Sequence, residues 1–364
     1  YLLGSILLLS TAVALAQTPT YDAYAGWYKQ WNDSLKGAHI TAAQHYLQLR
    51  HAKLRQQVVV GIVDSGIDVD SRALKSVLWT NAKEKLNGYV DDVHGWNFLG
   101  TKDGKFNMTS AGTEEYRQFK RLYPKYKYVK SAAEVPDSNR AEYAYYVKMR
   151  RKAKINSYLM FYEATARKQR LIHEMDSLLR ADHVAVDTLT MGGVMHVQVG
   201  DTLIRNSFVQ AAMTDLYRTP KTTLWNSYVA KQQAALVQME QRIRGIECDQ
   251  DKRLLMGDRL DDATDRFYGN NQLNIEGMEH GHFVASVVAG VVADDARYNG
   301  VWPQARLMAI RISPEGDEYD KDVVSGIRYA VDNGAKVVNL SFGKYTSPYP
   351  EMVNEAIAYA AKHD

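Results

Sequence analysis

The chain has 364 residues, of which 46% are hydrophobic and 24% are charged, and its formal net charge is +3. This balance is typical of a globular protein with one large domain or two. This net charge is too small to argue for nucleic acid or an anionic membrane as a partner, and no nucleic-acid partner is expected. The single cysteine, Cys248, excludes an internal disulfide, so stability must come from packing or from bound ions.

The first residues have the pattern of an export signal. The stretch 2–16 is apolar and ends in small residues at Ala14 and Ala16, as before a signal-peptidase site. Residues 1–16 are therefore predicted to be a signal-peptide remnant, and the run is too short to favour a retained membrane span. We expect an exported protein that is periplasmic, cell-surface or extracellular, with no membrane span in the mature chain.

A short extension precedes the first strand of the predicted core. Residues 17–57 are polar and aromatic, with an expected helix around 40–55, and are interpreted as a surface extension. Residues 58–101 open the core, because the stretch 58–63 is a nearly continuous apolar run typical of a strand buried on both faces of a parallel sheet. The run ends at Asp64, where α/β proteins bind ligands, although an isolated aspartate there fits a turn or a helix cap equally well.

Two adjacent acids follow in the turn-and-strand segment 86–98. The oxygen ligands of Asp91 and Asp92 suit calcium, but two acids are few ligands, and such a pair is more often a solvated turn. Calcium is left open, and no metal ligand or other cofactor is assigned.

Residues 102–267 differ in character, with many Tyr, Lys, Arg and Gln and few glycines. Helices are predicted over roughly 138–182 and 207–247, and a β-hairpin is predicted over 184–204 around Gly192-Gly193. We interpret this stretch as an inserted, mainly helical subdomain, with partner binding as one role considered for it. Its histidines show no metal-ligand spacing and are expected at the surface: His173, His183 and His196.

Strand and helix patterns alternate again over 268–364, which predicts a parallel sheet. The stretch 279–290 is apolar or small on every side, as expected of a buried helix. It opens with His280, where the positive end of the helix dipole favours a neutral imidazole that can accept a proton. A general base suits this position, provided that a second group orients it, and Asp64 is the candidate.

Three segments, in this order, resemble the subtilisin-like serine peptidases, or subtilases. They are the strand ending in Asp-Ser-Gly-Ile-Asp, the helix with His280-Gly281, and the stretch 337–343, Val-Val-Asn-Leu-Ser-Phe-Gly. The resemblance covers about 58–100 and 268–364, and similar variants share Gly95-Trp96-Asn97-Phe98 and a long insert. It implies an α/β fold with a parallel sheet flanked by helices, incomplete at the C-terminus and carrying a mainly helical inserted subdomain.

The resemblance also implies roles for five residues. Asp64 matches the triad aspartate, which holds the imidazole in the right tautomer, and His280 matches the triad base. The edge Ser341, Phe342 and Gly343 matches the stretch that pairs with substrate backbone and forms a wall of the first specificity pocket.

The sequence departs from the family pattern in two places. On the histidine helix, His282, Phe283 and Ser286 replace the usual Thr, His and Gly, which alters the packing around the base. Further along the chain, no Gly-Thr-Ser-Met-Ala segment occurs, so no nucleophile is assigned. The serine and the oxyanion asparagine are expected beyond Asp364, and the chain as given is predicted to be inactive.

Three functions are weighed. The first is an exported serine endopeptidase that hydrolyses polypeptides with an Asp/His/Ser triad. The second is a non-catalytic peptide-binding subtilase homologue, which a serine-directed fluorophosphonate would leave unlabelled. In the third, the insertion is an interaction module and the peptidase core is its scaffold.

Overall fold

The computed structural model describes residues 25–34, 36–50, 57–82, 87–248 and 251–363. The chain forms two compact units, which are described separately. The α/β unit comprises residues 1–110, 255–343 and 347–364, and the helical unit comprises residues 111–254 and 344–346. The predicted signal remnant, residues 1–16, lies outside the described residues, as does the end of the helix predicted over 40–55.

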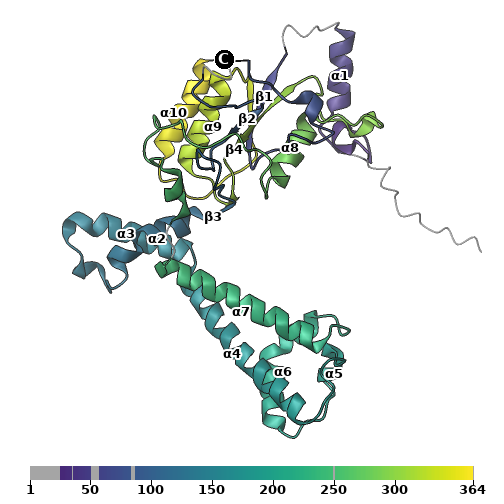
Figure 1. Ribbon diagram of the computed structural model, residues 1–364, viewed down its shortest axis with the longest axis vertical. Helices are drawn as coiled ribbons and strands as arrows, with labels where there is room; N and C mark the ends of the chain where they lie inside the picture. The colour runs from purple at the N-terminus through teal and green to yellow at the C-terminus, as the bar shows by residue number, and fades with distance from the viewer. Residues whose placement is uncertain (1–24, 35, 51–56, 83–86, 249–250, 364) are drawn as a thin grey trace, which may run out of the picture. The chain divides into compact units, whose positions relative to one another are not determined.

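The α/β unit is built on a parallel sheet, as predicted (Figure 1). Its strands, in the spatial order β2-β4-β1-β6, are β2 (Gly95–Asn97), β4 (Arg306–Arg311), β1 (Val59–Asp64) and β6 (Val337–Leu340). The central strand β1 pairs along one edge with β4 and along the other with β6. All of these pairings are parallel, so the strands end at one common edge of the sheet.

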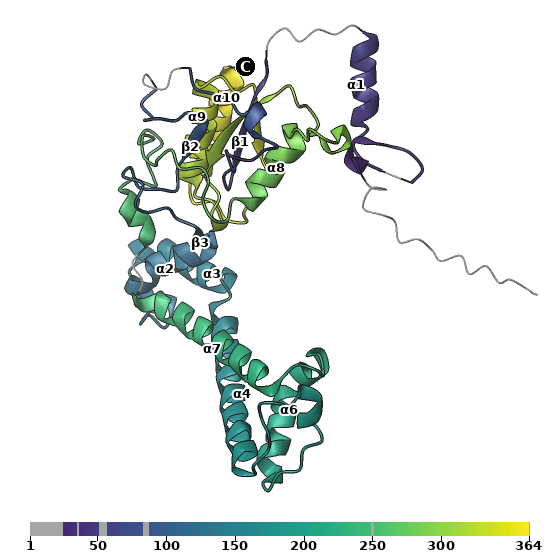
Figure 2. The same cartoon turned by 45° about the vertical axis from the view of Figure 1, so that its right-hand side comes forward.

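Helices cover both faces of this sheet (Figure 2). One face carries α8 (Glu279–Ala289), and the opposite face carries α9 (Asp320–Asp332) and α10 (Pro350–Lys362). Side chains of β1 alternate between them: Val60 and Ile62 belong to the core under α8, and Val63 to the core under α9. Because both faces are buried, every side chain of the strand can be apolar, which explains the unbroken run in the sequence.

Shorter elements and the N-terminal extension complete the α/β unit. Tyr28 donates from its hydroxyl to the carbonyl of Asn299 (2.6 Å), and Gln44 donates from Nε2 to the carbonyl of Val301 (2.9 Å). These bonds attach the extension to the loop after α8. The shorter elements, of which β3 and η6 run across the boundary between the units, are η2 (Trp27–Lys29), α1 (Ile40–Leu49), η3 (Lys75–Val77), β3 (Ser110–Gly112), η6 (Lys252–Met256), η7 (Ala296–Tyr298) and β5 (Glu315–Gly316).

The helical unit contains the long helices expected of the insertion, but they are divided differently. Its elements are α2 (Glu114–Tyr126), η4 (Ala132–Glu134), η5 (Asp137–Asn139), α3 (Arg140–Lys152), α4 (Ile155–Ala181), α5 (Met191–Val194), α6 (Thr202–Arg218) and α7 (Trp225–Cys248). The helix predicted over 138–182 is interrupted at Lys154, whose φ of 55° is incompatible with a continuous right-handed helix. The helix predicted over 207–247 is interrupted between α6 and α7, where Pro220 lies.

The β-hairpin predicted over 184–204 was wrong. Thr190 instead caps the short helix α5, since its hydroxyl accepts a bond from the Gly193 amide (3.2 Å). Asp201 caps α6 by accepting bonds from the amides of Leu203 (2.8 Å) and Ile204 (3.1 Å). Capping side chains favour helix starts at positions where an alternating pattern alone predicts strands.

Two apolar cores hold the helical unit together. The first joins α4, α5, α6 and α7, and contains Ile172, Met175, Leu179, Met191, Phe208, Trp225 and Tyr228. The second joins α2, α3 and the start of α4, and contains Phe119, Leu122, Tyr126, Tyr143, Tyr146, Met149 and Ile155. Among the described residues, no helix is both long enough and apolar enough to cross a membrane.

Candidate functional site

Asp64 and His280 meet at the carboxyl edge of the sheet. Asp64 is the last residue of β1, and His280 lies in the first turn of α8. The Nδ1 atom of His280 lies 2.8 Å from Oδ1 of Asp64, although 216 positions separate the two residues in sequence. The Asp64 side chain is 1% exposed and the His280 side chain is 59% exposed. The carboxylate is therefore enclosed behind an imidazole ring that remains open to solvent.

The geometry of this pair determines which imidazole nitrogen can act as a base. An ionised carboxylate only accepts hydrogen bonds, so Nδ1 of His280 must carry the proton that it shares with Asp64. In the neutral ring, Nε2 then keeps its lone pair. The backbone amide of Ser65 also donates to Oδ1 of Asp64 (2.7 Å), which holds the carboxylate in place.

Gly281 allows the start of α8 to lie directly against the end of β1. Its amide donates to the hydroxyl of Ser65 (3.0 Å). A Cβ atom at this position would lie 2.4 Å from the carbonyl oxygen of Gly66 and 3.1 Å from the Cβ of Asp64. Such distances are shorter than van der Waals contact. The contact between His280 and Asp64 therefore depends on the absence of a side chain at the next residue.

A buried arginine supports the backbone beside Asp64. Arg311 is the last residue of β4 and lies opposite Asp64 in the strand register. Its guanidinium donates to the Ser65 carbonyl (3.1 Å), to Oδ1 of Asn97 (3.0 Å) and to the Met108 carbonyl (2.7 Å). Burial lowers the pKa of Arg311 to about 10, against the opposing effect of nearby Asp322, so the group stays charged at neutral pH.

Ser65 and Arg311 were not predicted from the sequence. The available signal for Arg311 was a charged residue that directly follows four apolar residues of the strand, Leu-Met-Ala-Ile-Arg. Such a residue is buried only where polar partners are provided, and those partners come from three separate segments. For Ser65, the signal was only its position next to Asp64.

Replacing Arg311 with Met is expected to lower the free energy of unfolding by about 3 kcal/mol or more. The substitution removes three hydrogen bonds from buried acceptors, and each buried group left unpaired costs about 1–3 kcal/mol. Urea unfolding measures the change. The matched control is Arg306→Met on the same strand, where the guanidinium makes an exposed bond to the Ser76 carbonyl (2.7 Å). This control should stay within about 0.5 kcal/mol of the unaltered chain, and equal losses in both variants would contradict the prediction.

The predicted substrate edge, Ser341 to Gly343, begins where β6 ends. The pairing of β6 with β1 stops at Leu340, opposite Val63, so the next residues leave the sheet at the edge where Asp64 lies. Ser341 is exposed and donates to Oδ1 of Asn339 (3.0 Å). Phe342 packs against the core under α9, and a Cβ on Gly343 would meet nothing within 4 Å. The backbone of this edge is therefore open on the side of Gly343.

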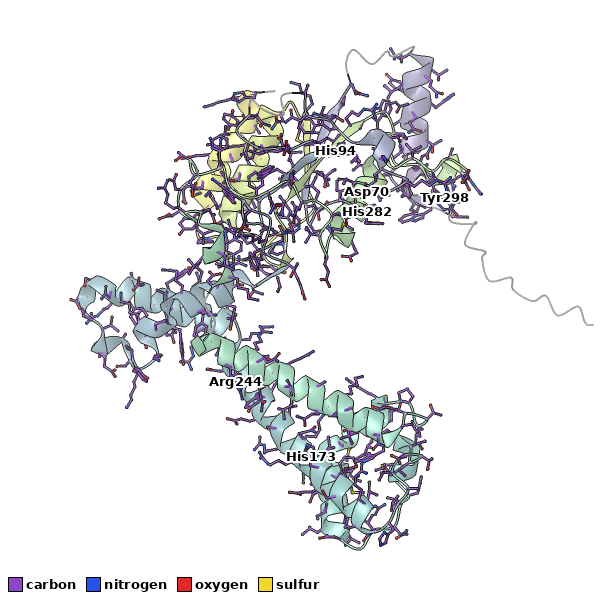
Figure 3. The ribbon with its side chains drawn as sticks, in the orientation of Figure 1. Asp70, His94, His173, Arg244, His282 and Tyr298 are labelled. Atoms are coloured by element: carbon purple, nitrogen blue, oxygen red, sulfur yellow. The ribbon has the colours of Figure 1, made fainter. Side chains whose placement is uncertain are left out.

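The departures from the family pattern on α8 coexist with the contact between Asp64 and His280. His282 is half-buried on α8 (Figure 3), and Phe283 next to it is exposed. The hydroxyl of Ser286 donates to the His282 carbonyl one turn earlier (2.8 Å). These side chains occupy other positions on the helix and leave His280 beside Asp64.

The neighbouring acids Asp91 and Asp92 have different surroundings. The buried carboxylate of Asp92 accepts bonds from Asn81 (2.7 Å), Asn87 (2.6 Å) and the Tyr329 hydroxyl (2.7 Å), so both of its oxygens face donors. Asp91 is exposed. This donor set does not fit a cation, and the described part of the chain holds no group of three or more His, Cys, Asp or Glu residues arranged for a metal. Calcium, which the sequence left open, therefore stays unassigned.

The histidines of the insertion are exposed, as predicted. His173, on α4 (Figure 3), contacts the side-chain amides of Gln169 (3.2 Å) and Gln233 (3.3 Å). The surroundings of His173 are those of an ordinary surface residue.

Comparison with known proteins agrees with this geometry. Residues 55–364 match the family model Peptidase_S8, described as the subtilase family. No solved structure matches the chain significantly.

Several curated proteins are similar to shorter stretches. Thermitase of Thermoactinomyces vulgaris is 35% identical over 78 residues, which cover 21% of this chain and 28% of thermitase. The cell wall-associated protease of Bacillus subtilis (strain 168) is 30% identical over 90 residues, 24% of this chain and 10% of that protein. The minor extracellular protease Vpr of the same organism is 41% identical over 69 residues, 19% of this chain and 8% of that protein. The matched stretches thus span less than a third of each relative.

Proposed function

The chain belongs to the subtilase family, and from this premise we propose that it carries the aspartate and the histidine of an exported serine endopeptidase. The observation that carries the proposal is the 2.8 Å contact between His280 Nδ1 and the buried carboxylate of Asp64. No segment of these 364 residues has the Gly-Thr-Ser-Met-Ala pattern. We therefore propose that the serine and the oxyanion asparagine belong to a part of the protein outside this sequence.

In the proposed reaction, His280 moves one proton in each direction. Its Nε2 takes the proton of the serine hydroxyl as the oxygen attacks the peptide carbonyl carbon, and the imidazolium returns that proton to the leaving amine. Water then attacks the acyl-enzyme by the same route, which frees the serine. Asp64 stays ionised throughout, because its role is to hold the imidazole orientation and to stabilise the imidazolium.

Polypeptides are the proposed substrates, and the proposed site for their backbone is the edge Ser341, Phe342 and Gly343. An extended peptide adds to a free strand edge through main-chain hydrogen bonds. Three features support this role: the edge leaves the sheet beside Asp64, the side chain of Ser341 is exposed, and the position of Gly343 is open. Export is proposed because of the apolar N-terminal run and because two similar proteins are named as cell wall-associated and extracellular.

Labelling with a serine-directed fluorophosphonate tests this function on the full-length protein. We expect one serine per chain to be labelled, because the reagent needs a hydroxyl activated by a neighbouring base. The His280→Ala variant should lose this labelling. Full-length protein that binds peptides but stays unlabelled would contradict the peptidase function and would support the non-catalytic peptide-binding alternative.

A further inference from the structure

Positive charge is distributed unevenly along the chain. The stretch 116–154 contains 12 lysines and arginines but only three acids, so its formal net charge is +9, whereas the whole chain has a net charge of +3. The remainder of the chain is therefore net negative. The stretch lies entirely within the helical unit, where it forms most of α2, the short elements η4 and η5, and α3.

Most of these basic side chains are open to solvent and have no acidic partner. Ten of the twelve are exposed, and the other two, Arg117 and Lys120, are half-buried. Four of the twelve pair with a carboxylate, namely Arg117, Lys125, Arg140 and Lys152. The other eight form no ion pair with any residue that the structure describes: Lys120, Arg121, Lys127, Lys130, Lys148, Arg150, Arg151 and Lys154.

The three acids of the stretch do not neutralise these eight cations. Glu142 pairs with Lys125 (2.5 Å), and Asp137 pairs with Arg140 (2.9 Å). Glu134 accepts bonds from a backbone amide (3.2 Å) and from a serine hydroxyl (3.4 Å). Because like charges repel one another, a set of unpaired cations costs free energy that a bound anion relieves.

The helix dipole explains only part of this excess. Basic residues are favoured in the last turn of a helix, and α3 ends with Arg150, Arg151 and Lys152. Arg121 lies in the middle of α2, and Lys130 lies outside both helices. The cations at these positions have no such local reason, so the stretch as a whole has the composition of a surface that meets anions.

A shared core fixes the directions in which the two helices present their charges. The helices α2 and α3 lie side by side (Figure 1) and pack through one apolar core. Phe119 and Leu122 of α2 and Tyr143 and Tyr146 of α3 are buried in it. Because these faces meet in the core, the exposed faces of the two helices point away from each other. The cations therefore lie on two sides of one packed pair of helices.

This distribution distinguishes between anionic partners. A flat anionic membrane reaches only one side of such a pair, and the apolar faces that insert into membranes are buried in the core. Single-stranded nucleic acid needs aromatic side chains on which its bases stack, whereas Tyr128 is the one exposed aromatic residue within 116–154. A flexible polypeptide rich in acidic residues can follow both sides, since an unfolded segment can wrap around a surface.

We propose that the stretch 116–154 is a binding surface for acidic segments of polypeptides. The choice of a polypeptide over other flexible polyanions rests on the proposed function, because polypeptides are the proposed substrates. Each exposed pair of opposite charges is weak, so binding depends on several carboxylates that engage the surface at the same time. Salt screens such pairs and is expected to weaken the binding.

The test measures the affinity of the full-length protein for a fluorescein-labelled decaglutamate peptide, with a Gly-Ser peptide of the same length as the neutral probe. One variant combines Arg121→Gln, Lys127→Gln and Lys130→Gln, and a second combines Lys148→Gln, Arg151→Gln and Lys154→Gln. The matched control changes three exposed basic residues of the same unit that also form no ion pair with a described residue, and so removes the same charge elsewhere. It combines Arg218→Gln, Lys221→Gln and Lys231→Gln.

We expect decaglutamate to bind and the Gly-Ser peptide not to bind. Each variant within 116–154 should raise the dissociation constant about tenfold, whereas the control should change it less than about twofold. Raising the ionic strength from about 0.1 M to about 1 M, which shortens the Debye length from about 10 Å to about 3 Å, should abolish the binding.

Three results would overturn the inference. They are no binding of decaglutamate, an equal loss in the control, and tighter binding of phosphatidylglycerol vesicles or decathymidylate than of decaglutamate. All variants should keep the rate of fluorophosphonate labelling, since none of the substituted residues belongs to the proposed site. Absence of labelling in the unaltered protein would contradict the proposed function instead, while the decaglutamate measurements would still decide on the binding surface.

Discussion

Replacing His280 with Ala is expected to lower kcat of the full-length protein about 10⁶-fold, and Asp64→Asn about 10⁴-fold. These magnitudes are the ones known for triads of the subtilisin and trypsin types, carried over to this chain by analogy. The physical reason lies in the 2.8 Å contact between the two side chains. Without His280 no group takes the serine proton, whereas an amide at position 64 no longer stabilises the imidazolium and favours the wrong tautomer. Initial rates on a peptide substrate measure both losses.

The neighbouring histidine provides the matched control for this experiment. His282 lies two residues further along α8 and is replaced by Ala in the same way. Since its ring is not next to Asp64, we expect the rate of His282→Ala to stay within a few-fold of the unaltered protein. A loss at His282 as large as that at His280, or full activity in Asp64→Asn, would contradict the assignment of the pair.

Replacing Gly281 with Ala is expected to lower kcat/KM at least about 100-fold, although the substitution adds one methyl group. The new Cβ would lie 2.4 Å from the Gly66 carbonyl oxygen, so the start of α8 must move away from the end of β1. A displacement of about 1 Å in a catalytic group is enough for a 10²-fold loss. Steady-state kinetics on a peptide substrate give the value.

Stability and activity should respond differently to this change. Alanine favours a helix over glycine by about 1 kcal/mol, which offsets part of the steric cost in the free energy of unfolding. Ser286→Ala, further along the same helix, is the control and should retain its rate. A Gly281→Ala variant with unchanged kcat/KM would show that close contact between α8 and β1 is not needed to hold His280.

The predictions that succeeded depend on local periodicity. The apolar run before Asp64 indicated a strand covered on both faces, and the structure places it at the centre of the parallel sheet between β4 and β6. The helix that begins near His280 was also expected, because the stretch 279–290 is apolar or small on every side. The family resemblance was confirmed by the match over residues 55–364.

The hairpin prediction failed because helix caps are also local signals, whereas the contacts that were not predicted involve distant parts of the chain. An alternating pattern predicted a hairpin around Gly192, whereas Thr190 and Asp201 cap helices there. The burial of Arg311 depends on acceptors from three distant segments. Nothing in the local sequence of Lys344–Thr346 indicates that this segment belongs with the insertion.

The sequence by itself determined the type of each core element, the parallel sheet and the two residues most suited to a base and its orienting carboxylate. These properties follow from hydrophobic periodicity and side-chain chemistry, which act over a few residues. Only the tertiary structure decided that the carboxylate and the imidazole lie 2.8 Å apart, that Gly281 must lack a side chain, and that Arg311 is buried among acceptors from three segments. Such distances depend on how elements that are far apart in the sequence pack together. Packing is a property of the whole fold rather than of any one segment.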